Sequence, residues 1–145
     1  MEAATVPEGF APARFSTGFL DVAGPYYTRK DADHIEVGIR IGEGHINGID
    51  VAHGGVLTTL ADVALSYQLF VSEKPHLPIA TINLNTNFLS GAKLGEWIVA
   101  HAYIDRKGSR TAYCHGNIVA GERLLMTMTG VFALLRKQPL LLVEP

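Results

Sequence analysis

The chain has 145 residues, of which 48% are hydrophobic and 18% charged, with a formal net charge of −2. This composition excludes a disordered or fibrous chain, and it shows no break that would separate two domains. The small negative charge gives no basic surface for nucleic acid, and no lysine and arginine cluster indicates a membrane surface. We therefore expect one soluble domain over residues 1–145, with its core at about 15–137.

The N-terminal stretch MEAATVPEGFAPARF carries an acidic residue at position 2 and no apolar run of the kind that a secretory signal needs. No window approaches the roughly 18 uninterrupted apolar residues of a spanning helix. We therefore expect a cytoplasmic protein with no membrane or nucleic-acid partner. The one cysteine, Cys114, excludes an internal disulfide and lies in an alternating apolar pattern, which favours a small core residue.

The first half of the chain predicts two strands and one long helix. Residues 19–28 predict a less regular strand, broken near Gly24-Pro25. Residues 34–41 alternate strictly between apolar and other side chains, which is typical of a half-buried strand. Residues 53–72 then predict a long helix, built from apolar and small residues and opened by two glycines.

Four more strands are predicted after the helix. Residues 79–89 alternate, with Ala80, Ile82, Leu84 and Phe88 on one face and Thr81 and three asparagines on the other. Residues 96–105, 110–120 and 123–135 follow with short connections, so they should be antiparallel neighbours. The inward faces of 96–105 and 110–120 are rich in Ala, Gly and Cys, which leaves room for the helix. We expect an α+β fold in which a continuous antiparallel sheet holds one helix.

Gly54 and Gly55 follow His53 at the expected start of the helix. The first backbone N–H groups of a helix have no partner within it, and the helix dipole adds partial positive charge there. Such an end can hold an anion or a developing oxyanion, and a glycine lets a substrate carbonyl approach closely. A tight turn into the helix is the alternative interpretation of these glycines. We expect His53 to close that turn, with a supporting role near the carbonyl as the alternative.

Asp62 lies inside the predicted helix, where aspartate is a poor helix former and cannot act as a cap. Its burial would be unfavourable without a hydrogen-bond partner. A narrow polar stripe can face either water or a partner chain; it consists of Thr58, Thr59, Asp62 and Ser66. A carboxylate in that position could be a general base for an attacking water or a nucleophile.

The sequence contains none of the motifs that mark serine hydrolases, nucleotide-binding loops or metal sites. The chain has no G-x-S-x-G motif for a serine hydrolase, no G-x-G-x-x-G and no Walker loop. The histidines at 45, 53, 101 and 115 do not have the spacing of metal ligands. We expect neither a metal nor an organic cofactor.

Asn47, Gly48, His53-Gly54-Gly55, Thr59-Leu60 and Asp62 have the spacing N-x6-G-G-x6-D. This pattern resembles the signature of hotdog-fold acyl-CoA thioesterases of the phenylacetate-degradation type, a group that includes 4-hydroxybenzoyl-CoA thioesterases. Further along, FLSGAKLGEWIVAHAYIDRKGSRTAY resembles the strand, loop, strand and hairpin of that group. The resemblance covers residues 35–135.

The resemblance implies a hotdog fold, in which a curved antiparallel sheet wraps one long central helix, and an enzyme that hydrolyses a CoA thioester. By position, Asn47 and the Gly54 N–H would polarise the thioester carbonyl, and Asp62 would activate water or attack directly. Thr81 would help to position the water. Coenzyme A is then part of the substrate, not a cofactor. The positions expected to contact the substrate are His53, Gly55, Phe88, Lys107, Gly108, Ser109 and Arg110.

Helix length gives a separate argument for an oligomer. At about 1.5 Å per residue, Gly54 and Asp62 lie roughly 12 Å apart along the helix axis, too far to act on one carbonyl and its water. Two antiparallel helices related by a two-fold axis would set Gly54 of one chain against Asp62 of the other. We expect a homodimer with shared sites, assembled further as a dimer of dimers.

Two other functions remain open at this point. A hotdog hydratase or dehydratase would use the same fold with a catalytic histidine, for which His53 is the nearby candidate. A non-catalytic acyl-CoA or lipid sensor would bind the thioester without turnover. The acyl group is not encoded in any motif: Phe88, Tyr67, Leu69 and Phe70 could shape an acyl pocket or belong to the core.

Overall fold

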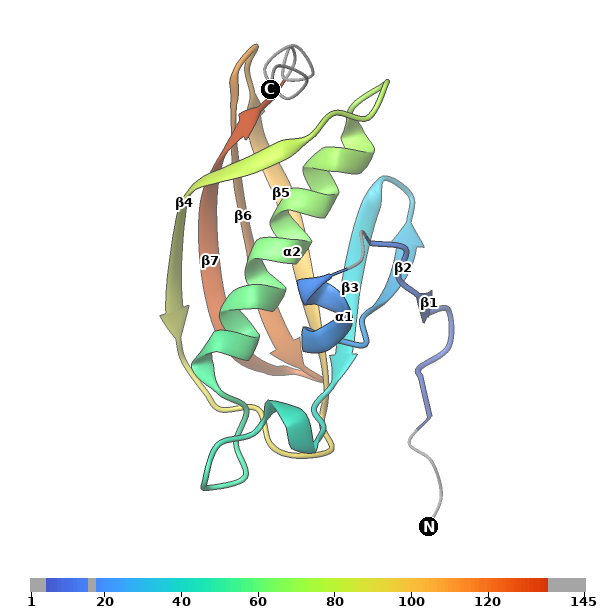
Figure 1. Ribbon diagram of the computed structural model, residues 1–145, viewed down its shortest axis with the longest axis vertical. Helices are drawn as coiled ribbons and strands as arrows, with labels where there is room; N and C mark the ends of the chain where they lie inside the picture. The colour runs from blue at the N-terminus through green and yellow to red at the C-terminus, as the bar shows by residue number, and fades with distance from the viewer. Residues whose placement is uncertain (1–4, 16–17, 136–145) are drawn as a thin grey trace.

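The computed structural model describes residues 5–15 and 18–135. Within them, the strands form one antiparallel sheet in the order β1-β2-β3-β5-β6-β7-β4, which curves around the long helix α2 (Figure 1). The elements in chain order are β1 (Ala11–Pro12), α1 (Phe19–Ala23), β2 (Tyr27–Asp31), β3 (His34–Arg40), the 3-10 helix η1 (Glu43–His45), α2 (Gly54–Ser72), β4 (Ile79–Phe88), β5 (Trp97–Lys107), β6 (Thr111–Ala120) and β7 (Arg123–Leu134).

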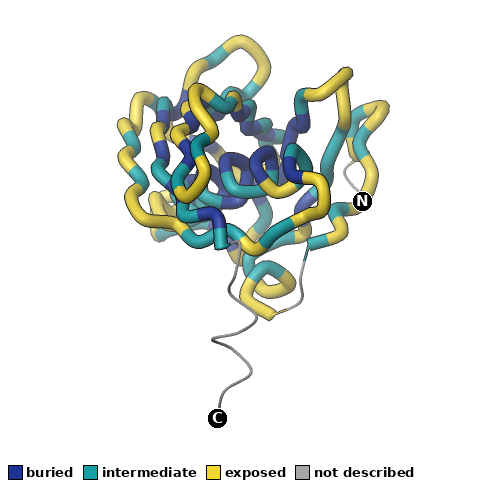
Figure 2. Tube along the Cα trace, turned by 90° about the horizontal axis from the view of Figure 1, so that it is seen from above, coloured by how far each residue is buried: buried dark blue, intermediate teal, exposed yellow. Residues whose placement is uncertain are grey.

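The core lies between the inner face of the sheet and one side of α2 (Figure 2). Small side chains of β5 and β6 are fully buried there, including Ala100, Ala102 and Ala112, as the sequence predicts. In β7, a Cβ on Gly130 would lie 3.0 Å from a methyl carbon of Leu65, so glycine allows the helix to approach the strand closely. Cys114 is buried, which confirms that it is a core residue, and burial raises the pKa of its thiol to about 12.

By length and composition alone, α2 would be long and apolar enough to cross a membrane. Its contacts with strands β3 to β7 instead identify it as the central helix of the sheet. Gln68 is buried on α2 and ties the helix to the β2–β3 hairpin: its Oε1 accepts the Ile35 N–H at 2.8 Å, and its Nε2 donates to the Asp33 carbonyl at 2.9 Å. These bonds satisfy a buried polar group on an otherwise apolar face.

The prediction of a strand over 19–28 is wrong for its first part. Residues Phe19–Ala23 form the short helix α1, and the strand β2 begins only at Tyr27. The Asp21 carboxylate accepts the Gly18 N–H at 3.2 Å, and Gly18 has a φ of 109°, which favours glycine. This local capping starts a helical turn before the chain reaches Gly24-Pro25.

The strict alternation predicted for β4 is interrupted by a β-bulge. Thr81 pairs with Phe132 and Asn83 pairs with Val131, so Ile82 is the extra residue between them. The bulge reverses the alternation, and Thr81 therefore faces α2 on the same side as Leu84, while Ile82 is 57% exposed. The expectation that Ile82 lies on the same face as Leu84, with Thr81 on the opposite face, is thus wrong.

The outer face of β3 is more buried than its alternation predicts. Glu36 is only 8% exposed, and Gly38 lies under the ring of Trp97. The segment before β1 covers this face: the ring of Phe10 contacts that of Trp97 edge to face, with centroids 5.1 Å apart. The Arg29 guanidinium lies 4.4 Å from the Phe10 ring centroid. The N-terminal segment therefore covers part of the outer face of β3.

Candidate active site

Asp62 and Thr81 come together from α2 and β4. The Thr81 hydroxyl donates a 2.6 Å hydrogen bond to Asp62 Oδ1. The bulge at Ile82 makes this contact possible, because it turns Thr81 toward the helix. Within the described ranges, Asp62 Oδ2 accepts no hydrogen bond from a side chain or from the backbone, so one carboxylate oxygen is held in place and the other is available.

The two residues lie in a cleft of about 520 Å³, here called the Asp62 cleft. Its lining combines the predicted polar stripe of α2 with residues of α1 and β4: Phe19, Leu20, Thr58, Thr59, Asp62, Val63, Ser66, Thr81 and Leu84. The hydroxyls of Thr58, Thr59 and Ser66 donate to carbonyls one turn back in α2, which satisfies them locally. Asp62 is therefore the charged group of this cleft.

The helix α2 begins at Gly54, after His53, as predicted. No side chain caps this end and no acidic residue stands in its first turn. In the described part of the chain, the N–H groups of Gly54 and Gly55 donate to no acceptor, so they can receive an anion or a polarised oxygen. Phe88 of β4 lies beside this end, since a Cβ on Gly54 would lie 3.3 Å from its ring.

Asn47 shapes the loop that leads into α2. Its Oδ1 accepts the N–H groups of Ile49 at 2.9 Å and Val51 at 3.3 Å, which is the turn role expected of an Asn-Gly pair. These bonds fix the orientation of the amide, whose Nδ2 donates to nothing within residues 5–15 and 18–135. Asn47 therefore combines a structural role with a free donor group.

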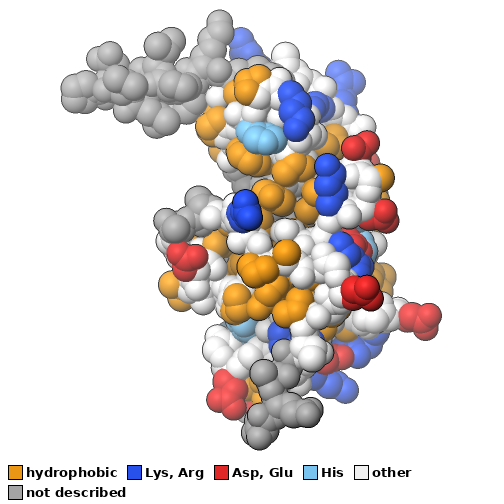
Figure 3. Space-filling view, turned by 90° about the vertical axis from the view of Figure 1, so that its right-hand side faces the viewer, with side chains coloured by type: hydrophobic (Ala, Val, Ile, Leu, Met, Phe, Trp, Pro, Cys, Tyr) orange, Lys and Arg blue, Asp and Glu red, His pale blue; other side chains and the backbone are white. Residues whose placement is uncertain are grey.

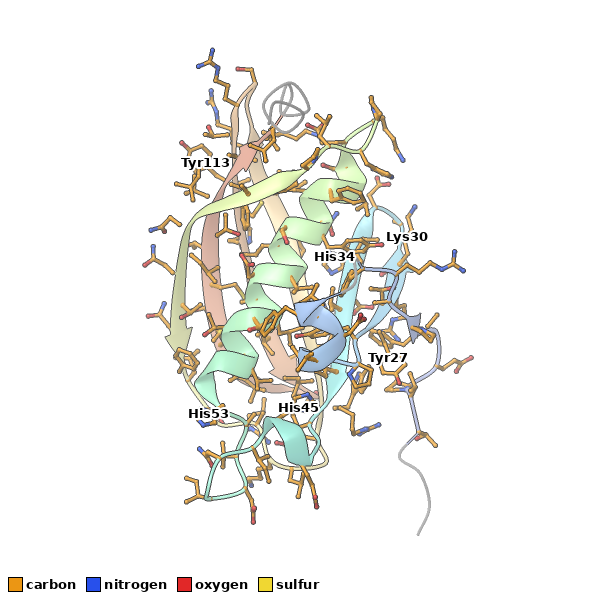
Figure 4. The ribbon with its side chains drawn as sticks, viewed as in Figure 1. Tyr27, Lys30, His34, His45, His53 and Tyr113 are labelled. Carbon is orange, nitrogen blue, oxygen red and sulfur yellow. The ribbon has the colours of Figure 1, made fainter. Side chains whose placement is uncertain are left out.

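The histidines near this loop differ in role, although both lie at the end of the molecule where α2 starts (Figure 4). His45 is buried: its Nδ1 accepts the Gly42 N–H at 2.9 Å, and its Nε2 faces the Ala23 carbonyl at 2.8 Å. It thus joins the loop to α1. His53 is exposed, and its backbone N–H donates to the His45 carbonyl at 2.9 Å, which closes the turn as expected.

The β5–β6 hairpin, with Lys107, Gly108, Ser109 and Arg110, lies at the other end of α2. Lys107 Nζ contacts the Ser72 hydroxyl and a Glu73 carboxylate oxygen, each at 3.2 Å. Within one chain, the predicted site residues therefore form three groups along α2: the start of the helix, the Asp62 cleft, and this hairpin. Sequence reasoning missed Phe19 and Leu20 in the cleft, because it placed them in a strand.

The family model of the Thioesterase superfamily matches residues 50–127. The chain belongs to this superfamily. A proposed esterase of Pseudomonas aeruginosa is 42% identical to this chain over 130 residues, which cover 89% of the chain and 97% of the relative. The human acyl-coenzyme A thioesterase 13 is 33% identical over 75 residues, or 52% of the chain and 53% of that protein. The protein is accordingly a hydrolase that acts on thioester bonds.

Solved structures show the same fold. Zebrafish thioesterase superfamily member 2 is similar with a TM-score of 0.74 and 23% identity, covering 82% of this chain and 88% of that one. A hypothetical thioesterase of Streptococcus pneumoniae, solved with coenzyme A, has a TM-score of 0.68 and 24% identity, covering 76% and 88%. The sheet wrapped around α2 is the hotdog fold that the sequence predicts.

Proposed function

We propose that this thioesterase hydrolyses acyl-CoA esters and that Asp62 is its general base or nucleophile. The observation that carries the proposal is the Thr81 hydroxyl bond to Asp62 Oδ1 at 2.6 Å, inside a cleft that opens to solvent. A carboxylate held through one oxygen can present the other to a water or to a carbonyl carbon. The names of the relatives, an esterase and acyl-CoA thioesterases, favour hydrolysis over hydration or binding alone.

In the base-catalysed form of this proposal, Asp62 takes a proton from water as the water oxygen bonds to the thioester carbonyl carbon. The carbonyl oxygen then carries the negative charge, which the Gly54 N–H and the Asn47 amide stabilise. As the C–S bond breaks, the CoA sulfur leaves with the proton held by Asp62. The Asp62 carboxylate, a water, the Gly54 N–H and the Asn47 side-chain amide supply every group that these steps use, so the proposed steps require no metal or organic cofactor.

The oxyanion donors and the base are proposed to come from different chains. In the straight helix α2, eight residues separate Gly54 from Asp62, about 12 Å along the axis. A two-fold dimer with antiparallel α2 helices would pair each Gly54 and Asn47 with the Asp62 and Thr81 of the partner chain. Such a dimer has two equivalent sites, and a dimer of dimers would have four.

The CoA moiety is proposed to contact the start of α2 and the β5–β6 hairpin. His53, Gly55 and Phe88 surround the helix start, where the thioester would bind. Lys107, Gly108, Ser109 and Arg110 would meet the nucleotide, whose phosphates suit lysine and arginine. The Streptococcus pneumoniae structure with coenzyme A supports a CoA ligand for this fold.

The proposal predicts that Asp62→Asn removes catalysis and preserves the protein. An amide oxygen can still accept the Thr81 hydroxyl, but it cannot take the proton from water. We expect kcat for thiol release from acyl-CoA to fall by about 10²–10⁴-fold, the range of lost acid–base catalysis, with an unchanged melting temperature. The matched control is Asp31→Asn, the same change at the exposed end of β2. Near-normal turnover of Asp62→Asn would exclude this carboxylate as base or nucleophile.

A further inference from the structure

A second cleft, of about 290 Å³, continues from the Asp62 cleft along α2. Three residues, Leu20 of α1 and Val63 and Ser66 of α2, line both clefts. The second cleft extends from them to Phe15, Tyr67, Phe70 and Ile79, with Arg14 at its edge. Together the two clefts form one path, here called the Ser66 channel, that starts at the carboxylate and passes beside Ser66.

Helix periodicity gives the channel its direction and length. Asp62, Ser66 and Phe70 are each four residues apart, so they lie on one face of α2 in a row. The row from Asp62 to Phe70 is about 12 Å long at about 1.5 Å per residue. An extended chain advances about 1.2 Å per bond, as the polypeptide backbone does, so the row matches about ten bonds. This is the reach of a medium-length acyl chain.

The far part of the channel is apolar and aromatic. The rings of Phe15 and Tyr67 meet edge to face with centroids 4.9 Å apart, and the ring of Phe70 stacks on His76 at 4.6 Å. The face that is the right-hand side of Figure 1 also carries hydrophobic side chains in a strip, with Lys and Arg side chains beside them (Figure 3). An apolar lining next to a polar reaction centre suits a ligand that is polar at one end and apolar beyond it.

We propose that the Ser66 channel binds the acyl group of the substrate and that the small side chain at Ser66 admits acyl groups of about eight to ten carbons. This inference rests on the proposed function, because it takes Asp62 as the place where the thioester carbonyl sits. The acyl chain then passes Ser66 toward Phe70, and its apolar surface is buried against Leu20, Val63 and Tyr67. Ser66 is a specificity-determining residue in this arrangement.

Ser66 offers a matched pair of variants that separate space from chemistry. Its hydroxyl donates to the Asp62 and Val63 carbonyls of its own helix, at 2.7 and 3.3 Å, and to no other element within the described residues. Ser66→Ala therefore keeps the channel open and removes only a local bond. Ser66→Leu fills the point where the two clefts join. On the proposed path of the acyl chain, this point comes after Asp62, so the thioester can still reach the carboxylate.

The experiment compares kcat/KM for butanoyl-CoA and decanoyl-CoA, measured by thiol release, in the wild type and both variants. We expect Ser66→Leu to lower the value for decanoyl-CoA at least tenfold, as misfitting methylenes do in a pocket, and to change that for butanoyl-CoA by less than about threefold. Ser66→Ala, which keeps the channel open, should leave the ratio of the two values close to the wild-type ratio. An equal loss on the two substrates, or no loss on either, would overturn the channel while leaving the thioesterase intact.

A second variant tests the far end without touching Ser66. Phe70 is 36% exposed, and Phe70→Ala should shift the preference toward acyl chains longer than decanoyl by removing the ring at the end of the path. The control is Tyr113→Ala on β6, which removes an aromatic ring of similar exposure, 43%, from a position away from α2 (Figure 4). A wild type that acts on butanoyl-CoA and not on decanoyl-CoA would refute the channel alone. Inactivity on every acyl-CoA would refute the proposed function as well.

Discussion

Glu36 and His101 illustrate at the residue scale how the covered outer face of the sheet changes side-chain chemistry. Arg29 Nε lies 2.6 Å from Glu36 Oε1, and this hydrogen bond holds the pKa of the Glu36 carboxyl below its usual value. His101 Nδ1 lies 3.6 Å from the other Glu36 oxygen and 3.1 Å from His34 Nε2. Burial lowers the pKa of His101, and the attraction of Glu36 opposes that shift only in part.

The lowered pKa of His101 predicts a loss of stability in mild acid. The unfolded histidine titrates near 6.5, and the folded one titrates lower. Between these two values the unfolded state binds more protons, so the free energy of unfolding should decrease as the pH falls below about 6.5. Above about pH 6.5, His101 is neutral in both states and no longer lowers the free energy of unfolding. Glu36 acts in a separate window, because its depressed pKa affects stability only below about 4.5.

Urea unfolding of the wild type and of His101→Gln between pH 8 and 5 measures this contribution. The variant should lose part of the decrease seen in the wild type below pH 6.5. His53→Gln, at an exposed position, is the matched control and should follow the wild type. Identical pH profiles for the wild type and His101→Gln would show that the His101 proton is not linked to folding.

The main site residues could be predicted one by one because a local pattern marks each of them. Two glycines mark the helix start at Gly54, and a carboxylate among apolar residues marks Asp62. Alternation alone does not predict the Asp62–Thr81 contact, because it places Thr81 on the face opposite Leu84; only the family resemblance set Asp62 and Thr81 in one site. A bulge depends on how β4 pairs with β7, and that pairing is not a property of the β4 sequence alone.

At the element scale, sequence patterns predict long elements well and short ones poorly. The positions and antiparallel pairing of β5, β6 and β7 follow from alternation and short turns, and α2 from its length. The helix α1 has only five residues, too few to show a helical period, and its Leu20 packs against the core. Its local cap at Gly18 and Asp21, together with this packing, overrides the strand-like sequence.

The β5–β6 hairpin gives a prediction at this scale. Lys107 is engaged by Ser72 and Glu73 at the end of α2, whereas the Arg110 side chain contacts no acceptor in the described part of the chain. Arg110 is therefore the better candidate for the CoA phosphates. Arg110→Ala should raise KM for an acyl-CoA more than for the matching acyl-pantetheine, which lacks the nucleotide phosphates.

Steady-state kinetics on the two esters of one acyl group provide the comparison for Arg110. Lys30→Ala removes a cation from β2, which lies elsewhere on the molecule, and serves as the control (Figure 4). Equal changes in KM on the two esters would place Arg110 outside the nucleotide site. A change in kcat alone would lead to the same conclusion, since phosphate binding far from the carbonyl should act on substrate capture.

At the scale of the whole molecule, α2 determines how the site is assembled. The helix lies along the curved sheet from Gly54 to Ser72, so the start of the helix and the Asp62 cleft stay apart in one chain (Figure 1). The sequence alone allowed this conclusion, because the distance depends only on the number of residues and the helical rise. No local sequence pattern predicts the pairing with a partner chain that would bring the two groups together. This pairing has to be tested with two different variants of the chain.

Two variants that damage opposite halves of the proposed site provide that test. Asn47→Asp keeps the Oδ1 bonds to Ile49 and Val51, so the loop should be preserved, and it replaces the donor Nδ2 with an oxygen. Asp62→Ala removes the carboxylate. Each homodimer should be inactive, since both of its sites carry the lesion. Melting temperatures close to that of the wild type would establish that each variant folds.

Co-expression of the two variants should then restore activity. In a mixed dimer, one site carries both lesions, whereas the other joins the intact Asn47 of one chain to the intact Asp62 of its partner. Random pairing of equal amounts makes about half of the dimers mixed, each with one good site of two, so activity should recover to roughly a quarter of wild type. The two chains can carry different affinity tags, and purification through both tags isolates the mixed dimer, which should have about half of wild-type activity. If doubly tagged dimers are obtained and remain as inactive as the parents, all the catalytic groups must act within one chain, and the proposed pairing of α2 helices is wrong.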